Sequence, residues 1–221
     1  MISNNISLKV IEMMRVARFM YLLIVAVGFA FLLSLVMLAH SYFKKSGKIY
    51  IETDRLILRK IRRRDKRGLC RIFSDKDITH FSTWEPVDRE GTKEFMRETR
   101  ESYKENGYGN LAVILKKTGC LIGTCGIHKI KMGEQDIVGL GCLLAKGYCG
   151  NGYGTEAYKA IRDYVFRYLQ FDTVFSYIHP YNIALIRVAE KNGMRYLKEG
   201  KFLDNHCLVY GITRDEWKDL Y

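Results

Sequence analysis

The amino-acid sequence predicts an α/β domain over residues 49–221, built on a mixed, mostly antiparallel central sheet flanked by helices. Two observations lead to this class. Short apolar runs of strand length and longer amphipathic runs of helix length follow one another, with Gly, Asn and Pro where they join. Strands stand on both sides of the helices, which gives a mixed sheet. A hydrophobic fraction of 48% suits one domain with a real core.

The first half of the domain is expected to hold a strand, two helices and a meander of three antiparallel strands. The strand covers residues 49–59, and the helices cover residues 66–74 and 89–106. Polar, glycine-containing turns separate the meander strands. Those strands are the apolar runs 109–116, 119–131 and 137–145.

The second half alternates helices and strands. A helix over residues 155–170 has apolar residues at spacings of four, and an apolar strand over residues 173–179 follows it. Pro180 ends this strand, and a helix then runs from Asn182 to Asn192, where Gly193 stops it. Two strands at residues 195–199 and 207–213 are expected to form a closing hairpin.

A glycine-rich turn joins the last meander strand to the helix at 155–170. Gly150, Gly152 and Gly154 alternate with other residues there. Glycines let backbone N–H groups approach a ligand without an intervening Cβ atom. The helix that follows offers N–H groups and the positive end of its dipole. The turn therefore predicts a binding site for a diphosphate.

This order of strand, glycine turn, helix, strand and Asn-initiated helix resembles the core of the GNAT acetyltransferase superfamily. The segment 182–194 is similar to the Asn-helix of that family. The segments 51–59 and 77–86 are similar to its RimJ/RimL-like branch. The resemblance covers roughly residues 49–214, and it implies a GNAT-type sheet and direct transfer of an acetyl group from acetyl-CoA, the co-substrate, to a primary amine.

The resemblance also implies which residues bind acetyl-CoA. The strand before the glycine turn would pair its main chain with the pantetheine arm through Leu143, Leu144 and Ala145. Asn182 would hydrogen-bond the same arm. The cradle for the pyrophosphate would consist of Cys149, Gly150, Asn151, Gly152, Tyr153, Gly154 and Thr155. Cys149 is interpreted as structural, because direct transfer needs no nucleophilic thiol.

Two proton donors common in the family are absent from this sequence. The branch often has Ser where this chain has Leu185, and many members have Tyr where it has Ala189. Tyr181, Tyr177 or water could replace them, although packing explains both tyrosines equally well. Glu85, His128 and His179 are candidate bases, and a lone His on an apolar strand is more often a core residue. Trp84 is a candidate acceptor contact.

Two functions of different classes remain open at this stage. The first is an acetyl-CoA-dependent N-acetyltransferase acting on a protein N-terminus, a small amine such as a polyamine, or an amine-bearing antibiotic. The second is a non-catalytic, membrane-anchored acyl-CoA-binding sensor or scaffold. Leu185 and Ala189 favour the second, whereas the glycine turn, Asn182 and Trp84 favour the first. We expect an enzyme.

Residues 1–48 are expected to be a membrane anchor with a short basic linker. Residues 19–39 contain no charge and are long enough for one transmembrane helix. A cleaved signal peptide and a start codon further downstream are the alternatives. Basic residues are more numerous after this segment than before it, so the positive-inside rule predicts a single-pass protein with a cytoplasmic catalytic domain.

The net charge of +12 is uneven, and its densest basic stretch is residues 59–67. A solvated surface is the usual explanation of such a stretch. Because the stretch follows the apolar segment, anionic lipid headgroups are the second interpretation. Nucleic acid is the least favoured partner, since no base-reading motif is present. The six cysteines show no CxxC spacing and the five histidines are scattered, so no metal site is expected.

Overall fold

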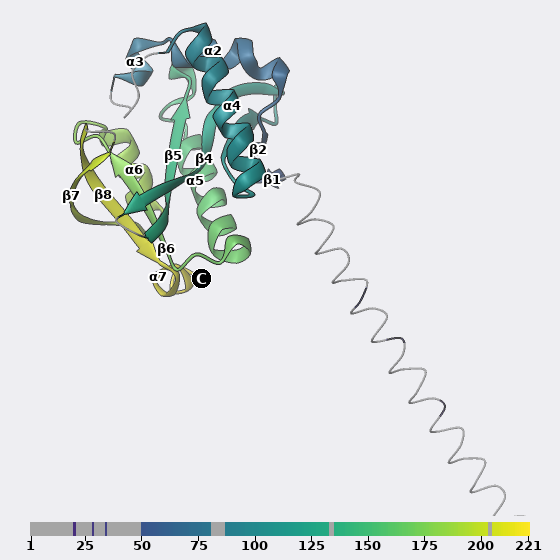
Figure 1. Cartoon of the computed structure of the whole chain (residues 1–221), viewed down its shortest axis with the longest axis vertical. Coiled ribbons are helices and arrows are strands. Elements are labelled where there is room, and N and C mark those ends of the chain that lie inside the picture. Colours follow the sequence, from purple (N-terminus) through teal and green to yellow (C-terminus); the bar gives the residue numbers. More distant parts are fainter. Residues whose placement is uncertain are drawn as a thin grey trace, which may run out of the picture. The chain divides into compact units, whose positions relative to one another are not determined.

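The computed structural model describes residues 20, 28, 34, 50–80, 87–132, 135–202 and 205–221 (Figure 1). The chain divides into two compact units, Met1–Gly47 and Lys48–Tyr221, and the elements below all belong to the second. The predicted anchor at 19–39 lies outside the described residues except for positions 20, 28 and 34. Within the described part of the chain, no helix combines the length and the apolar composition needed to cross a membrane.

The described strands form one sheet in the order β1-β2-β3-β4-β5-β6-β8-β7. Every neighbouring pair is antiparallel except β5 and β6, which are parallel, so the prediction of a mixed, mostly antiparallel sheet is confirmed. The strands are β1 (Tyr50–Glu52), β2 (Leu56–Lys60), β3 (Asn110–Leu115), β4 (Cys120–Met132), β5 (Gln135–Leu144), β6 (Thr173–Ile178), β7 (Arg195–Phe202) and β8 (Asn205–Thr213).

The prediction of a single strand over residues 49–59 is wrong, because the chain reverses there to form the hairpin β1–β2. The side chain of Thr53 closes this turn. Its Oγ1 accepts a hydrogen bond from the Leu56 backbone N–H at 3.0 Å, and the Thr53 N–H donates to the Leu56 carbonyl at 3.0 Å. A polar side chain that satisfies backbone groups locally favours a turn over a continuous strand.

The helices are α2 (Lys66–Phe73), α3 (Lys76–Thr79), α4 (Arg89–Glu105), α5 (Tyr153–Tyr164), α6 (Ile183–Lys191) and α7 (Arg214–Lys218). The helix predicted at 155–170 begins earlier and ends as the π-helical turn η3 (Val165–Leu169). The helices α3 and α7 were not predicted, since four or five residues are too few to show helical periodicity. The other helices lie close to their predicted ranges.

Two hydrophobic cores lie on opposite faces of the sheet. Ala157, Tyr158 and Ile161 of α5 are fully buried in the larger core. The helices α2 and α4 lie side by side (Figure 1) and form the smaller core. There the rings of Phe73 and Phe95 meet edge to face at 4.8 Å. Neighbouring residues of β5 contribute to different cores, as the alternation of side chains along a strand requires.

Candidate active site

The sheet opens between its two parallel strands. The strands β5 and β6 pair only at Val138 with Val174 and at Gly139 with Phe175. Both strands continue beyond these pairs, β5 to Leu144 and β6 to Ile178, but they do not pair with each other there. An open edge of this kind offers backbone N–H and C=O groups to a ligand that lies along it.

The register between β4 and β5 decides which residues of β5 present their main chain to this opening. The Ala145 N–H donates to the Ile122 carbonyl of the neighbouring strand at 2.8 Å. In an antiparallel pair, hydrogen-bonded positions alternate with positions that point the other way. The main chains of Leu143 and Ala145 therefore face β4, whereas those of Cys142 and Leu144 face the opening. Of the three residues expected to pair with the pantetheine arm, Leu144 is thus in position, Leu143 and Ala145 are turned toward β4 by the antiparallel alternation, and Cys142 was not predicted.

The glycine turn follows β5 directly. After the 3₁₀ turn η2 (Lys146–Tyr148), Gly150 and Gly152 have φ angles of 77° and 78°, in the left-handed region that favours glycine. Gly152 is the N-cap of α5, so the first backbone N–H groups of this helix emerge at the turn. This arrangement suits a diphosphate, because converging N–H groups and a helix dipole attract anions.

Arg55, in the turn between β1 and β2, holds the glycine turn from outside. Its guanidinium donates to the Asn151 carbonyl at 3.0 Å and lies 4.5 Å from the centre of the Tyr153 ring. Its Nε is 2.6 Å from a carboxylate oxygen of Glu156, in the first turn of α5. A Cβ atom at Gly152 would lie 3.3 Å from the same guanidinium, so the two segments are in close contact.

Glu156 is the centre of this connection. Its carboxylate also accepts hydrogen bonds from the Thr53 hydroxyl at 2.6 Å and from the Arg55 N–H at 2.9 Å. Burial alone would raise the pKa of Glu156, but these hydrogen bonds and the charge of Arg55 lower it. The sequence analysis missed this pair, because opposite charges 101 positions apart give no local pattern.

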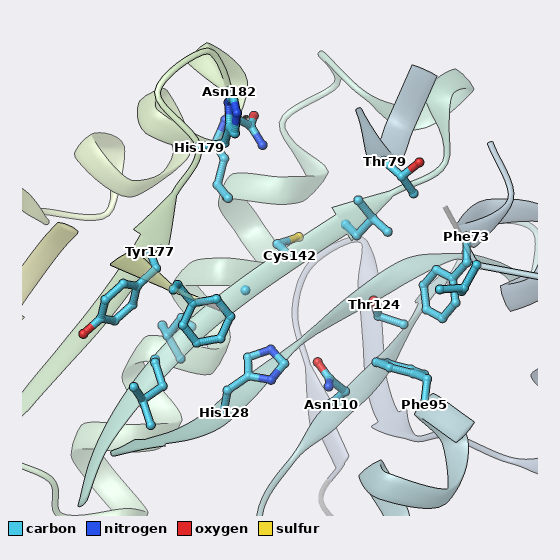
Figure 2. A pocket seen from close by; sticks show the side chains of 18 residues that line it. Phe73, Thr79, Phe95, Asn110, Thr124, His128, Cys142, Tyr177, His179 and Asn182 are labelled. Atoms are coloured by element: carbon cyan, nitrogen blue, oxygen red, sulfur yellow. Dashed lines mark hydrogen bonds between the residues drawn. The ribbon is translucent and has the colours of Figure 1, made fainter. Parts of the chain in front are cut away.

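A pocket extends from the opening between β5 and β6 across β4 and β3 to α2 and α4. Figure 2 shows Asn182 and His179 at the top of the view, Phe73 and Phe95 at the right, and His128 at the bottom. Its volume is about 940 Å³ with the open mouth included. The described residues that line it are Phe73, Thr79, Val87, Phe95, Asn110, Thr124, His128, Ile130, Gly139, Leu140, Gly141, Cys142, Leu143, Tyr177, His179, Asn182, Leu185 and Phe202.

Two glycines of β5 make room for side chains of β4 in the floor of this pocket. A Cβ atom at Gly139 would lie 2.5 Å from Cδ1 of Ile130. One at Gly141 would lie 3.1 Å from Nε2 of His128. The imidazole therefore lies over β5, close to the point where β5 and β6 separate.

Desolvation in this position lowers the pKa of His128 to about 4. The ring is thus uncharged at neutral pH, with one nitrogen that accepts a hydrogen bond and one that donates. Of the two described residues predicted to be catalytic, His128 lines the pocket and Tyr181 does not.

The other predicted catalytic and acceptor residues lie elsewhere or outside the described residues. Tyr181 is 73% exposed, and the centre of its ring lies 5.7 Å from that of His179 at a tilt of 46°, where both residues line a second hollow. Trp84 and Glu85 lie in residues 81–86, outside the described part of the chain, and their roles stay predictions. The described residues on either side of that segment, Thr79 and Val87, line the pocket.

The side chains of Asn182 and Cys149 both contact nearby backbone groups. The Asn182 side-chain oxygen accepts the Leu185 N–H at 3.0 Å and so caps α6, and the residue lines the pocket. The Cys149 sulfur lies 3.8 Å from the Leu144 carbonyl and 3.7 Å from the Ala145 carbonyl. Burial raises the pKa of Cys149, which keeps it a thiol and not a reactive thiolate.

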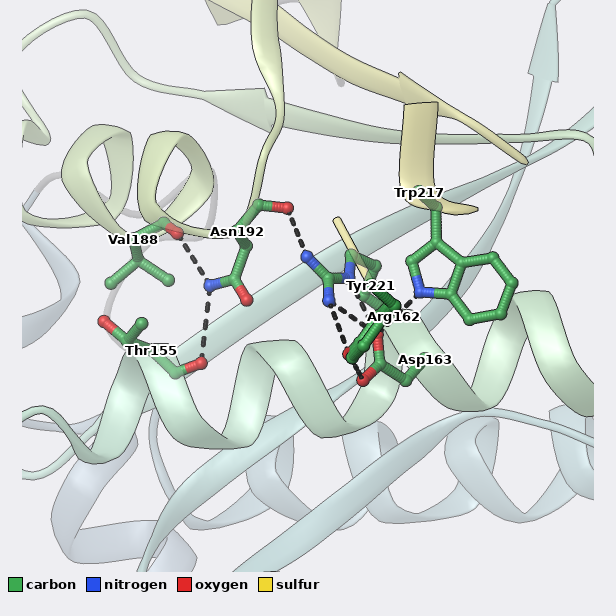
Figure 3. Close-up of polar contacts among 7 residues, drawn as sticks. All are labelled: Thr155, Arg162, Asp163, Val188, Asn192, Trp217 and Tyr221. Carbon is green, nitrogen blue, oxygen red and sulfur yellow. Dashed lines mark hydrogen bonds and ion pairs between the residues drawn. The ribbon is translucent and has the colours of Figure 1, made fainter. Parts of the chain in front are cut away.

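A buried network fixes α6 against α5 (Figure 3). Arg162, with 2% of its side chain exposed, donates to the Asn192 carbonyl at 2.6 Å and pairs with Asp163 at 2.6 Å. The Asn192 side-chain amide donates to the carbonyls of Val188 at 2.8 Å and Thr155 at 3.3 Å. These contacts fix the position of α6, which Asn182 caps, relative to α5, which follows the glycine turn.

Among the described residues, no group of His, Cys, Asp and Glu side chains is arranged to hold a metal ion. The described cysteines are all free thiols. The described site thus consists of a main-chain cradle, an open strand edge and a pocket with a neutral imidazole.

Comparison with known proteins identifies this arrangement. The family model of the acetyltransferase (GNAT) domain matches residues 55–195. The protein YkkB of Bacillus subtilis strain 168 is 37% identical over 169 residues, which cover 75% of this chain and 96% of YkkB. An acetyltransferase from Agrobacterium tumefaciens has a similar structure, with a TM-score of 0.66 and 29% identity over 74% of this chain and 93% of its own.

The fold is also similar to that of RimJ from Mycobacterium smegmatis, solved with CoA-disulfide. Its TM-score is 0.62 at 21% identity, and the match covers 73% of this chain and 83% of RimJ. At this level of identity the likeness concerns the fold alone. The family model and the identity to YkkB confirm the resemblance inferred from the glycine turn and the Asn-helix, so this chain belongs to the GNAT acetyltransferase family and is an N-acetyltransferase.

Proposed function

We propose that this chain transfers the acetyl group of acetyl-CoA directly to a primary amine bound in the pocket described above. Enzymes of this family use acetyl-CoA. One observation carries the proposal: the open edge of β5 leads from the glycine turn straight into the pocket. A ligand with a diphosphate at one end and a thioester at the other matches this path.

The residues that would bind acetyl-CoA follow from the geometry. The glycine turn and the first N–H groups of α5 would hold the diphosphate. The main chains of Cys142 and Leu144, which face the opening, would pair with the amide groups of the pantetheine arm. Asn182 would contact the same arm from α6. When bound, acetyl-CoA supplies an activated acetyl thioester.

His128 is the residue that we assign to the acceptor amine. Because its ring is uncharged at neutral pH, its unprotonated nitrogen can accept a hydrogen bond from the amine and orient it. As the amine attacks, its proton would pass through His128 to solvent. Tyr181 is exposed outside the pocket lining, whereas Tyr177 lines the pocket, so we propose Tyr177 or water as the proton donor to the departing thiolate.

Calorimetry with acetyl-CoA and thiol release against a panel of primary amines test this proposal on the purified full chain. We expect binding of acetyl-CoA, and thiol release that matches the amount of N-acetylated product. Binding without turnover on the whole panel would favour the acyl-CoA sensor, with Leu185 and Ala189 as the reason. Absence of binding by the folded chain would contradict the cradle at the glycine turn.

We also propose that residues 19–39 anchor the chain in a membrane as a single-pass protein with a cytoplasmic domain. The charge-free run and the basic residues that follow it support this. In the basic stretch 59–67, Arg59 is bound to Asp65 at 2.7 Å. The exposed side chains left for lipid headgroups are Arg62, Arg63, Arg64 and Arg67.

Membrane fractionation tests the anchor. The full chain should stay in the pellet after alkaline carbonate extraction, and residues 48–221 alone should stay in the supernatant. Protease added to sealed inverted vesicles should degrade the domain, and protease added to intact cells should not. Release of the full chain by carbonate would contradict the anchor, and degradation in intact cells would contradict the orientation.

A further inference from the structure

We infer that the acceptor is a single primary amine attached to an uncharged, apolar body, and not a polyamine. This inference rests on the proposed function, because it names the class of amine that the same pocket accepts. It follows from the composition of the pocket, the positions of its polar groups and the absence of a counter-charge among its described residues.

The composition of the pocket is unusual for a site that receives a cation. None of its described lining residues is Asp, Glu, Lys or Arg. The described side chains that reach it are aromatic, aliphatic or neutral polar. A buried ammonium group is stable only when a carboxylate or several hydrogen-bond acceptors replace its water.

The apolar and polar groups of this pocket are separated in space. Phe73 and Phe95 form one wall together with Val87 and Leu143. Figure 2 shows Asn110 and Thr124 between this wall and His128. An amine held at His128 would therefore point its attached group at the aromatic wall.

A second ammonium group on the acceptor would be placed badly. It would lose hydration against the Phe73–Phe95 wall, where the described residues offer no carboxylate. The nearby helix α3 carries Asp77, but this side chain is largely exposed and lies 2.6 Å from the ammonium of Lys146. An apolar body, in contrast, gains from the same wall because its burial removes apolar surface from water.

The matched pair hexylamine and 1,6-diaminohexane tests the inference, because the two differ chiefly by one terminal ammonium group. Calorimetry on the CoA-loaded full chain measures binding, and thiol release from acetyl-CoA measures turnover. We expect hexylamine to bind at least about tenfold more tightly, which corresponds to roughly 1.4 kcal/mol. Equal or tighter binding of 1,6-diaminohexane would overturn the inference.

Substitution of Asn110 adds a carboxylate to the pocket with little change of shape. In Asn110→Asp, the affinity for hexylamine should exceed that for 1,6-diaminohexane by a smaller factor than in wild type. The new charge can pair with the second ammonium group. The matched control is Asn106→Asp, which adds the same charge at the end of α4, away from the pocket lining. A preference that is identical in the two variants would contradict the inference.

Glu85 requires its own variant, because it lies outside the described residues. Glu85→Gln should leave the preference for hexylamine unchanged. If the wild-type chain instead prefers 1,6-diaminohexane and Glu85→Gln reverses this, the acceptor is a cation recognised by that carboxylate and the inference is wrong.

The two readouts separate this inference from the proposed function. Selective binding of hexylamine without thiol release would support the inferred ligand class and contradict catalysis. Thiol release that is equal for both amines would support catalysis and contradict the inferred class. Phenethylamine and a peptide with an N-terminal Phe then distinguish a small acceptor from a protein N-terminus, since both carry one amine on an apolar body.

Discussion

The glycine turn and the acceptor end of the pocket at Phe73 and Phe95 would recognise their ligands by different means. At the glycine turn, the proposed diphosphate would meet backbone N–H groups whose directions depend on the left-handed conformations of Gly150 and Gly152. At the acceptor end, the proposed amine would meet side chains such as Phe73 and Phe95, which come from different helices. The first end depends on conformation within a few consecutive residues, and the second depends on packing between distant segments.

The electrostatics of the two ends also differ. Charged groups support the glycine turn from outside, where Arg55 and Glu156 join it to the β1–β2 hairpin. The described lining of the acceptor end carries no formal charge, and its imidazole is kept neutral. Substitutions at one end should therefore change acetyl-CoA binding, whereas substitutions at the other should change the acceptor or the rate of transfer.

The largest effect is expected from Gly152→Val in the glycine turn. A β-branched residue at φ 78° is strained by about 1–3 kcal/mol, and its side chain would also press on Arg55. We expect the affinity for acetyl-CoA to fall on the order of 100-fold, measured by calorimetry.

Gly147→Ala is the matched control for Gly152→Val. Its backbone is not left-handed, and an added Cβ would meet no described atom within 4 Å. It should bind acetyl-CoA as the wild-type chain does. Equal affinity of the Gly152→Val and Gly147→Ala variants would show that the turn does not hold the diphosphate.

His128→Ala, in the pocket, should have the next largest effect. Loss of the group that orients the amine should lower kcat by about 100-fold and leave the KM for acetyl-CoA nearly unchanged. His128→Gln, which keeps a hydrogen-bonding group, should recover part of kcat. The exposed His206, which pairs with Glu199 on the neighbouring strand, provides the control His206→Ala. A kcat equal to that of wild type in His128→Ala would exclude the assigned role.

The pH profile sharpens this prediction. His128 takes up a proton only as the pH falls toward about 4, so it should cause no loss of kcat/KM above that range. The acceptor amine must lose its proton to react, so kcat/KM should rise with pH through the neutral range. A further decrease in kcat/KM as the pH falls, beyond that caused by protonation of the amine and centred near the ordinary histidine pKa of 6.5, would contradict the neutral imidazole.

The smallest effect is expected from Glu156→Gln, which weakens the support of the glycine turn. The free energy of unfolding should decrease by about 1–2 kcal/mol at neutral pH, measured with urea. Arg55 is 47% exposed, so a double-mutant cycle with Arg55→Ala should give a coupling of only about 0.5–1 kcal/mol.

The pH dependence of this effect has a defined sign. Because the folded-state pKa of Glu156 is lowered, its stabilisation is fully present above the unfolded value near 4.5 and is lost as the pH falls through the folded value. The difference between wild type and Glu156→Gln should therefore shrink in acid. Glu94→Gln, at an exposed carboxylate of α4, is the control and should change stability little at any pH. A difference that grows in acid would contradict the lowered pKa.

Prediction from the sequence succeeded where a residue acts on its own surroundings. The strand at 137–145, the glycine turn and the Asn-capped helix all follow from local patterns, and the structure places them close to the predicted positions. The error at 49–59 has the same local origin. The hydroxyl of Thr53 closes a turn inside a run that otherwise alternates like a strand.

The site residues divide along the same line. The left-handed turn at Gly150 and Gly152 could be inferred because such conformations favour glycine and depend on those residues alone. The choice of catalytic side chains could not, since placing the candidate base His128 in the pocket and the candidate proton donor Tyr181 outside its lining needs the β4–β5 register and the direction of α6. The pair of Arg55 and Glu156 also escaped prediction.

The sequence by itself thus determined the family, most of the helices and strands, and the glycine turn proposed to bind the diphosphate, because each of these depends on backbone conformation over a few consecutive residues. The tertiary structure alone decided where β5 and β6 separate, which main-chain groups face the opening and which of the described side chains, none of them Asp, Glu, Lys or Arg, line the pocket. These features arise from packing between segments far apart in the sequence, where no local pattern records which residues will meet.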